Sequence, residues 1–64
     1  MRDPARLDRF YRELKDIHKE YLPDWRFGQF MINFLSAADT DPFFWEENKF
    51  IEKAREYAKK VTGR

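Results

Sequence analysis

Few side chains in this 64-residue sequence have the types and spacing that catalysis requires. His18 is the only histidine, and a general base of this kind needs an orienting carboxylate and a nucleophile. Asp16 and Glu20 are each two residues away, so on a helix they do not share its face. We therefore expect His18 to pack at the edge of a helix, and we expect the protein not to be an enzyme.

The acidic residues between positions 39 and 47 superficially suggest a calcium loop. A calcium-binding EF-hand needs glycine at the sixth position and a bidentate glutamate at the twelfth. Counted from Asp39, these positions hold Phe44 and Phe50. The sequence also has no cysteine, no HExxH motif and no glycine-rich phosphate loop. We therefore expect neither a metal nor a cofactor.

Two amides, Gln29 and Asn33, lie four residues apart and so share one flank of a helix. They could satisfy backbone groups at a neighbouring helix end, because a buried amide without partners costs a few kcal/mol. Alternatively, they form a partner-binding or self-complementary surface together with Trp25 and Ile32. Both interpretations stay open on the sequence alone.

Basic residues are concentrated near the end of the chain, but the formal net charge is only +1. Such a charge supplies no bulk field that would attract nucleic acid or anionic lipid. A basic last turn also suits the negative end of a helix dipole. The alternative function is a nucleic-acid-binding helical module whose contacts would be Lys49, Lys53, Arg55, Lys59 and Lys60.

The composition predicts a single helical domain over residues 1–64. Seven Phe, three Tyr and two Trp are a heavy aromatic content for so short a chain, and the core must be built from these large side chains. Without cysteine or an apolar signal-peptide region, a reducing cytoplasm is the expected compartment. No apolar stretch is long enough to suggest a membrane segment.

Residues 4–21 have apolar side chains at the i, i+3, i+4, i+7 spacing of an amphipathic helix. Asp3 is a good N-cap, and Pro4 suits the first helical position. Pro23 disfavours helical geometry in the residue before it. The first helix is therefore expected to end near Tyr21 or Leu22.

A second helix is predicted over residues 25–38, with Asp24 as its N-cap. Trp25 and Ile32 fall on the side opposite the main apolar face. A helix that is apolar on two sides is either central to the fold or packed against another molecule, so we expect it to lie centrally. The expected core face is Phe27, Phe30, Met31, Phe34 and Leu35.

Asp41 and Pro42 repeat the start signal of Asp3 and Pro4. We predict a helical turn over residues 42–44 that closes the core, rather than an exposed docking peptide. A third main helix is expected over residues 46–61, ended by Gly63.

The sequence resembles the YihD-like family of short bacterial and phage proteins. That family has an Arg-Leu start, a Pro-Asp motif followed by alternating apolar residues and Gln, and a last helix opened by two acidic residues. The present chain departs from the pattern at Trp25, where an aliphatic residue is usual, and in its longer basic end. The resemblance implies an all-helical fold and no established activity. The matching residues are Arg6, Leu7, Pro23, Asp24, Phe27, Gln29, Phe30, Glu46 and Glu47.

We therefore predict an all-α, compact three-helix domain with a short additional turn before the last helix. The expected function is a small interaction or regulatory module that acts through a helix face, with a second copy as one candidate partner. The predicted binding surface is Trp25, Gln29, Ile32 and Asn33.

Overall fold

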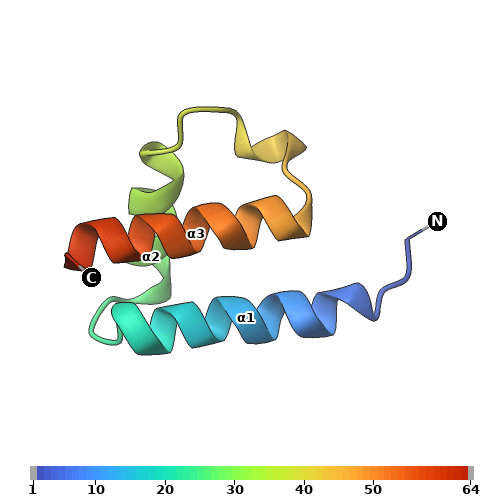
Figure 1. The fold of residues 1–64 in the computed structure, drawn as a ribbon, viewed down its shortest axis with the longest axis horizontal. Coiled ribbons are helices and arrows are strands. Elements are labelled where there is room, and N and C mark those ends of the chain that lie inside the picture. The colour runs from blue at the N-terminus through green and yellow to red at the C-terminus, as the bar shows by residue number, and fades with distance from the viewer. Residues whose placement is uncertain (1, 64) are drawn as a thin grey trace.

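The three amphipathic segments are helical in the structure, a computed structural model that describes residues 2–63 (Figure 1). Within this range the chain forms α1 (Arg6–Tyr21), α2 (Phe27–Ser36) and α3 (Glu47–Thr62). A 3-10 turn, η1 (Pro42–Phe44), lies between α2 and α3. The predicted all-α, three-helix fold with an additional turn before the last helix is confirmed.

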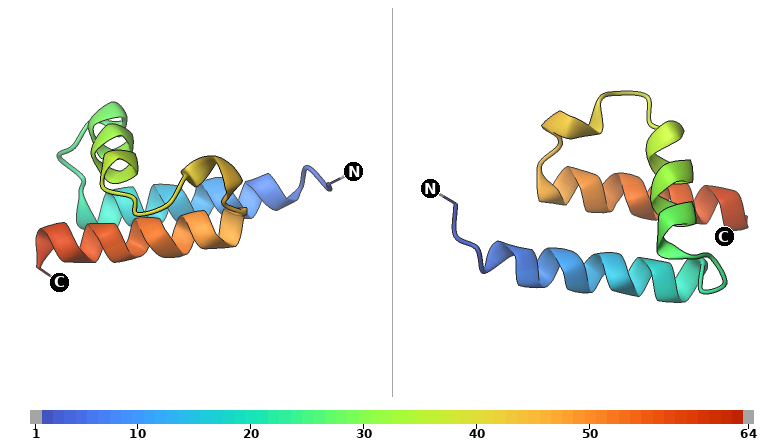
Figure 2. Two further views of the ribbon diagram at one scale, coloured as in Figure 1. Left: turned by 90° about the horizontal axis from the view of Figure 1, so that it is seen from above. Right: turned by 180° about the vertical axis from the view of Figure 1, so that it is seen from behind.

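Helices α1 and α3 lie side by side and run in the same direction, so both of their N-termini are at one end of the molecule (Figures 1 and 2). These two helices make the most extensive backbone contact between described elements. Helix α2 crosses one face of the pair near its C-terminal end, and residues 37–46 then return the chain to the start of α3. The prediction of a central second helix is wrong, because α2 is only 10 residues long and covers one end of the α1–α3 pair.

The core combines large aromatic side chains with two fully buried alanines. Phe34 contacts the rings of Phe30, Trp45, Phe50 and Tyr57, with centroid distances between 5.3 and 6.2 Å. On α3 the alanines present little side-chain volume toward the core, which allows a close approach of packed helices. The buried residues are Leu14, Ile17, Leu22, Phe30, Phe34, Ile51, Ala54 and Ala58.

Asp3 caps the turn that precedes α1, but the α-helix itself begins at Arg6, two residues later than expected, and its N-cap residue is Ala5. The Oδ1 atom of Asp3 accepts a hydrogen bond from the backbone N–H of Ala5 at 3.0 Å. The carbonyl of Asp3 accepts from the N–H of Arg6 at 3.2 Å, so a tight turn precedes the helix. Helix α1 ends at Tyr21, in agreement with the effect expected from Pro23.

The predicted start of α2 is wrong, and so is its predicted cap. Pro23 and Asp24 lie in a turn in which the N–H of Trp25 bonds to the carbonyl of Leu22 at 3.1 Å. The helix begins only at Phe27, and Oε1 of Gln29 accepts a hydrogen bond from the N–H of the preceding residue, Arg26, at 2.8 Å. Gln29 therefore satisfies a backbone donor at the start of its own helix. The helix ends at Ser36, two residues before the predicted end.

Replacement of Gln29 with alanine is expected to lower the free energy of unfolding by roughly 0.5–1 kcal/mol, because the Arg26 N–H loses its acceptor. Gln29→Glu should be at least as stable as the natural protein, since it keeps an oxygen acceptor and adds negative charge near the positive helix end. Urea unfolding followed by far-UV circular dichroism measures both variants. Equal losses in the two variants would contradict the capping role.

Helix α3 begins and ends one residue after its predicted bounds, and Gly63 adopts a left-handed conformation with φ of 74° at its C-terminal end. The turn before it was predicted to close the core, and this is wrong for two of its residues. Phe43 is 83% exposed and Phe44 is 78% exposed. Trp45, which follows the turn, is the side chain that reaches the core, where its ring lies 6.0 Å from that of Phe34.

Phe27 was also predicted in the core but is 56% exposed. Because α2 begins at this residue, the Phe27 ring reaches only the edge of α1, where its centroid lies 6.4 Å from that of His18. Phe30 and Phe34 are buried as predicted, and Met31 and Leu35 pack against the core from half-buried positions.

Candidate functional site

His18 is held against the turn between α1 and α2. Its Nε2 atom lies 2.7 Å from the backbone oxygen of Trp25. A carbonyl oxygen can only accept, so Nε2 carries the proton in this contact. The ring also packs at 5.3 Å from the ring of Phe30. This geometry agrees with the expected edge packing and gives Nε2 a structural hydrogen bond.

The predicted binding surface is divided in the structure. Trp25 precedes α2 and packs against Tyr57 of α3, with ring centroids 6.5 Å apart. Gln29, Ile32 and Asn33 are exposed on the outer side of α2, where Ile32 is 69% exposed. Trp25 is thus half-buried against the fold, and Ile32 is the large apolar side chain that remains on the outer side of α2.

The predicted nucleic-acid contacts also do not form one patch on α3. At about 100° per residue they fall into two groups on different sides of the helix. The groups are Lys49, Lys53 and Lys60 on one side, and Arg55 and Lys59 on the other. The exposed sector between the groups carries Glu52 and Glu56. Alternating charge of this kind is typical of a solvated helix face.

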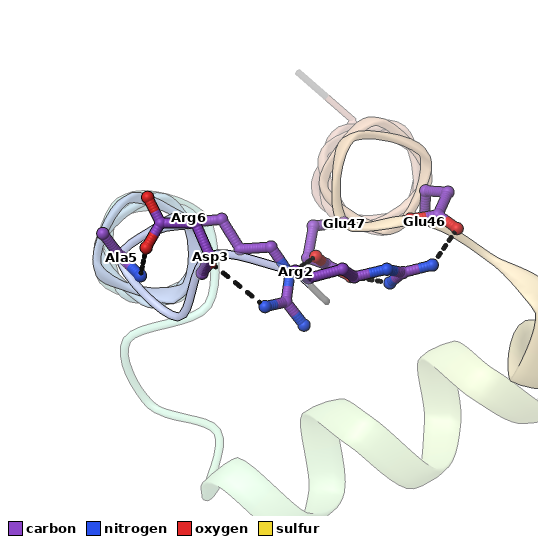
Figure 3. Close-up of polar contacts among 6 residues, drawn as sticks. All are labelled: Arg2, Asp3, Ala5, Arg6, Glu46 and Glu47. Atoms are coloured by element: carbon purple, nitrogen blue, oxygen red, sulfur yellow. Dashed lines mark hydrogen bonds and ion pairs between the residues drawn. The ribbon is translucent and has the colours of Figure 1, made fainter.

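A cluster of ion pairs joins the N-terminal ends of α1 and α3 (Figure 3). Nη2 of Arg2 lies 2.6 Å from Oε1 of Glu46, and Nε of Arg6 pairs with the carboxylate of Glu47. Arg6 also donates from Nη1 to the carbonyl oxygen of Asp3 at 3.2 Å. The charges in this cluster therefore compensate one another, and the ion pairs connect the start of α1 to the start of α3. We call this cluster the ionic clamp.

A groove of about 360 Å³ lies beside this cluster. Its walls come from the first half of α1 and the start of α3. The residues lining it are Arg6, Arg9, Phe10, Glu13, Glu46, Glu47, Asn48 and Ile51. Because Arg6 and Glu47 are already paired, and Arg9 pairs with Glu13 at 3.3 Å, the groove offers little free charge to a ligand.

Glu47→Gln is expected to lower the free energy of unfolding by up to about 1 kcal/mol at low salt. The substitution removes the charge that pairs with Arg6 and that faces the positive end of the α3 dipole. Because both interactions are screened, the loss should shrink at high salt. Unfolding at low and high salt measures the effect, with the exposed Glu52→Gln as the control. A loss independent of salt would contradict an ionic clamp.

A larger apolar depression of about 620 Å³ lies where the C-terminal end of α2 faces α3, and we call it the α2–α3 hollow. Aromatic rings, alanines and a valine supply its apolar surface, and charged side chains from α3 and from the loop after α2 also line it. It is lined by Phe34, Ala37, Ala38, Asp39, Trp45, Lys53, Glu56, Tyr57, Lys60 and Val61.

Two interactions hold the loop side of the hollow in place. Nε1 of Trp45 donates a hydrogen bond to Oγ1 of Thr40 at 3.0 Å. Nζ of Lys53 lies 3.8 Å from Oδ1 of Asp39. The indole of Trp45 therefore presents its apolar surface from a fixed position, 6.0 Å from the ring of Phe34.

The surface of the hollow is suited to contact with an apolar group. It offers ring faces and methyl groups, together with the charged side chains of Asp39, Lys53, Glu56 and Lys60. Sequence reasoning did not predict this site. The signal in the sequence was the pair Tyr57 and Val61. They are four residues apart on the last helix and therefore extend its apolar face.

Among residues 2–63 there is no group of three or more acidic, histidine or cysteine side chains that could hold a metal ion. Likewise, none of the described helices has the length and apolar character needed to cross a membrane.

The fold and the hollow thus define a small all-α protein with a depression at the junction of two helices that is lined by apolar and charged side chains. Comparisons with protein-family models, curated proteins and solved structures found no match to this chain. The resemblance to the YihD-like family stays a prediction.

Proposed function

We propose that this protein is a non-catalytic interaction or regulatory module that binds an apolar side chain of a protein partner in the α2–α3 hollow. The observation that carries the proposal is the hollow itself, in which Phe34, Trp45 and Tyr57 line an open depression of about 620 Å³. The proposal keeps the predicted class of function but moves the binding surface from the outer side of α2 to this hollow.

The composition of the hollow resembles the anatomy of protein interfaces. Such interfaces have an apolar centre enriched in aromatic residues and a polar rim. Tryptophan and tyrosine also dominate binding energy where they are ordered and become desolvated. Here Trp45 is held by Thr40, and Tyr57 packs on Phe34 with ring centroids 5.6 Å apart. Binding would therefore cost little conformational entropy at these side chains.

The test is an NMR titration with N-acetyl-phenylalaninamide, a small aromatic probe. Saturable shifts are expected for the Trp45 indole N–H and the Val61 methyl groups. Val61→Lys should abolish them, because it places an ammonium group in the hollow, and lysine is favourable in the last turn of a helix. Ile32→Lys, on the outer side of α2, is the matched control and should bind the probe normally.

Two results would overturn the proposed site. One is the absence of saturable shifts at the Trp45 and Val61 signals. The other is a Val61→Lys variant that is folded and binds the probe as tightly as the natural protein.

A further inference from the structure

Two adjacent phenylalanines project from η1 and are the most exposed large apolar side chains of the described residues. The rings of Phe43 and Phe44 contact each other edge to face, with centroids 5.0 Å apart. We call this pair the aromatic knob. Burial of phenyl rings is strongly favourable, so two adjacent rings that stay in water on a folded domain mark a contact surface.

The knob is presented by an ordered turn. Oδ1 of Asp41 accepts a hydrogen bond from the N–H of Phe43 at 3.0 Å, and the N–H of Trp45 bonds to the carbonyl of Pro42 at 3.1 Å. A turn closed at both ends in this way holds its side chains at defined positions. The exposure of the knob is therefore a property of the fold.

Along the chain, the knob comes directly before a residue of the α2–α3 hollow. Trp45 follows Phe44 directly in the chain and lines the hollow, but neither phenylalanine lines it. A protruding apolar pair and an apolar depression of the same chain thus lie next to each other. Each copy of the chain therefore carries both the projection and the depression that a self-complementary contact requires.

We infer that the protein forms a symmetric homodimer in which the aromatic knob of each copy occupies the α2–α3 hollow of the other. This inference rests on the proposed function and names the partner as a second copy of the chain. Because the knob and the hollow are neighbours, a two-fold axis between them satisfies both contacts at once. Such reciprocal contacts close the assembly at two copies and prevent further growth.

The volume of the hollow and the area that the dimer would bury both agree with this arrangement. A cavity of about 150 Å³ is large enough to hold one benzene ring, so a hollow of about 620 Å³ has room for two phenyl rings. Four phenylalanines and the surfaces they cover would bury roughly 1,000–1,600 Å² in total. Specific protein interfaces start at about 1,000–1,200 Å².

One pair of charges next to the two surfaces is complementary. Asp41 precedes the knob and Lys60 lines the hollow, which also carries Glu56 and the paired residues Asp39 and Lys53. Within the described residues neither Asp41 nor Lys60 makes an ion pair. Insertion of the knob would bring Asp41 of one copy toward Lys60 of the other, which contributes mainly to orientation.

Sedimentation velocity from micromolar to millimolar concentration tests the dimer. The natural protein should change from monomer to dimer over this range. The double variant Phe43→Ala/Phe44→Ala should raise the dissociation constant by about 100-fold or more. Its circular dichroism should be unchanged, since both side chains are exposed. Phe27→Ala, which also removes an exposed phenylalanine, is the control and should dimerise normally.

Mixing gives a sharper test. The double variant retains an intact hollow, and Val61→Lys retains an intact knob, so neither should dimerise alone. Their mixture can form a heterodimer with one of the two contacts, and it should associate more strongly than either variant by itself. This result requires that the knob of one variant enters the hollow of the other, and a natural protein that stops at two copies then indicates that the insertion is reciprocal.

The inference is overturned if the natural protein stays monomeric at millimolar concentration, if the double variant dimerises normally, or if the mixture associates no better than its components. The titration with N-acetyl-phenylalaninamide tests the proposed function independently of the dimer. A monomer whose hollow still binds N-acetyl-phenylalaninamide would refute the dimer and retain the hollow as a site for another partner.

Discussion

Phe30→Ala is expected to leave much of the protein unfolded without denaturant. Phe30 is 0% exposed, and its ring lies 5.3 Å from His18 and 6.2 Å from Phe34. Truncation of a buried phenylalanine to alanine costs about 3–5 kcal/mol. A 64-residue domain has a total free energy of unfolding of only roughly 3–10 kcal/mol. The loss is therefore comparable with the whole stability of the domain.

Phe27→Ala is the matched control, because it makes the same substitution three residues earlier in the same helix. Phe27 is 56% exposed, so its truncation should cost less than about 1 kcal/mol. Urea unfolding of both variants, followed by far-UV circular dichroism, gives the comparison. Similar losses of unfolding free energy for Phe27→Ala and Phe30→Ala would contradict the observed orientation of α2, which buries Phe30 and exposes Phe27.

Ala54→Leu should have the second largest effect. Ala54 is fully buried in α3, the helix in most extensive contact with α1. Extra methylene groups at a fully packed position force neighbouring side chains or helices apart, at a cost of about 1–3 kcal/mol. We expect a lower midpoint of thermal unfolding, and a loosened α1–α3 contact visible as faster amide hydrogen exchange in both helices.

Ala37→Leu makes the same substitution at an exposed position that lines the α2–α3 hollow. Its effect on the thermal midpoint should be small, because the added side chain has free space to occupy. It should instead weaken binding of the aromatic probe by filling part of the hollow. Equal destabilisation by Ala37→Leu and Ala54→Leu would argue against tight packing around α3.

Local signals in the sequence were sufficient for most helix boundaries. Asp3 caps the first turn, Pro23 follows the end of α1, and Gly63 ends α3 with a positive φ. Each of these effects depends on a residue and its immediate neighbours along the chain. This is why the first and last helices could be predicted to within two residues.

The start of α2 could not be predicted from the same kind of signal. Asp24 and Gln29 are both suitable capping residues, and the choice between them depends on the turn after α1. That turn is held by the contact between His18 and the carbonyl of Trp25, which joins a residue of α1 to a residue of the turn seven positions later. A prediction of the α2 N-cap from neighbouring residues could not take this contact into account.

The sequence by itself determined the helical class, the end of α1, the glycine end of α3 and the burial of Phe30 and Phe34, because these depend on neighbouring residues or on spacing along a single helix. Only the tertiary structure decided that α1 and α3 lie side by side, that Trp25 packs on α3, and that Phe43 and Phe44 remain exposed. The α2–α3 hollow belongs to this second group. It forms where α2, the loop containing Trp45, and α3 meet, and apolar spacing within one helix carries no information about which faces of different helices meet.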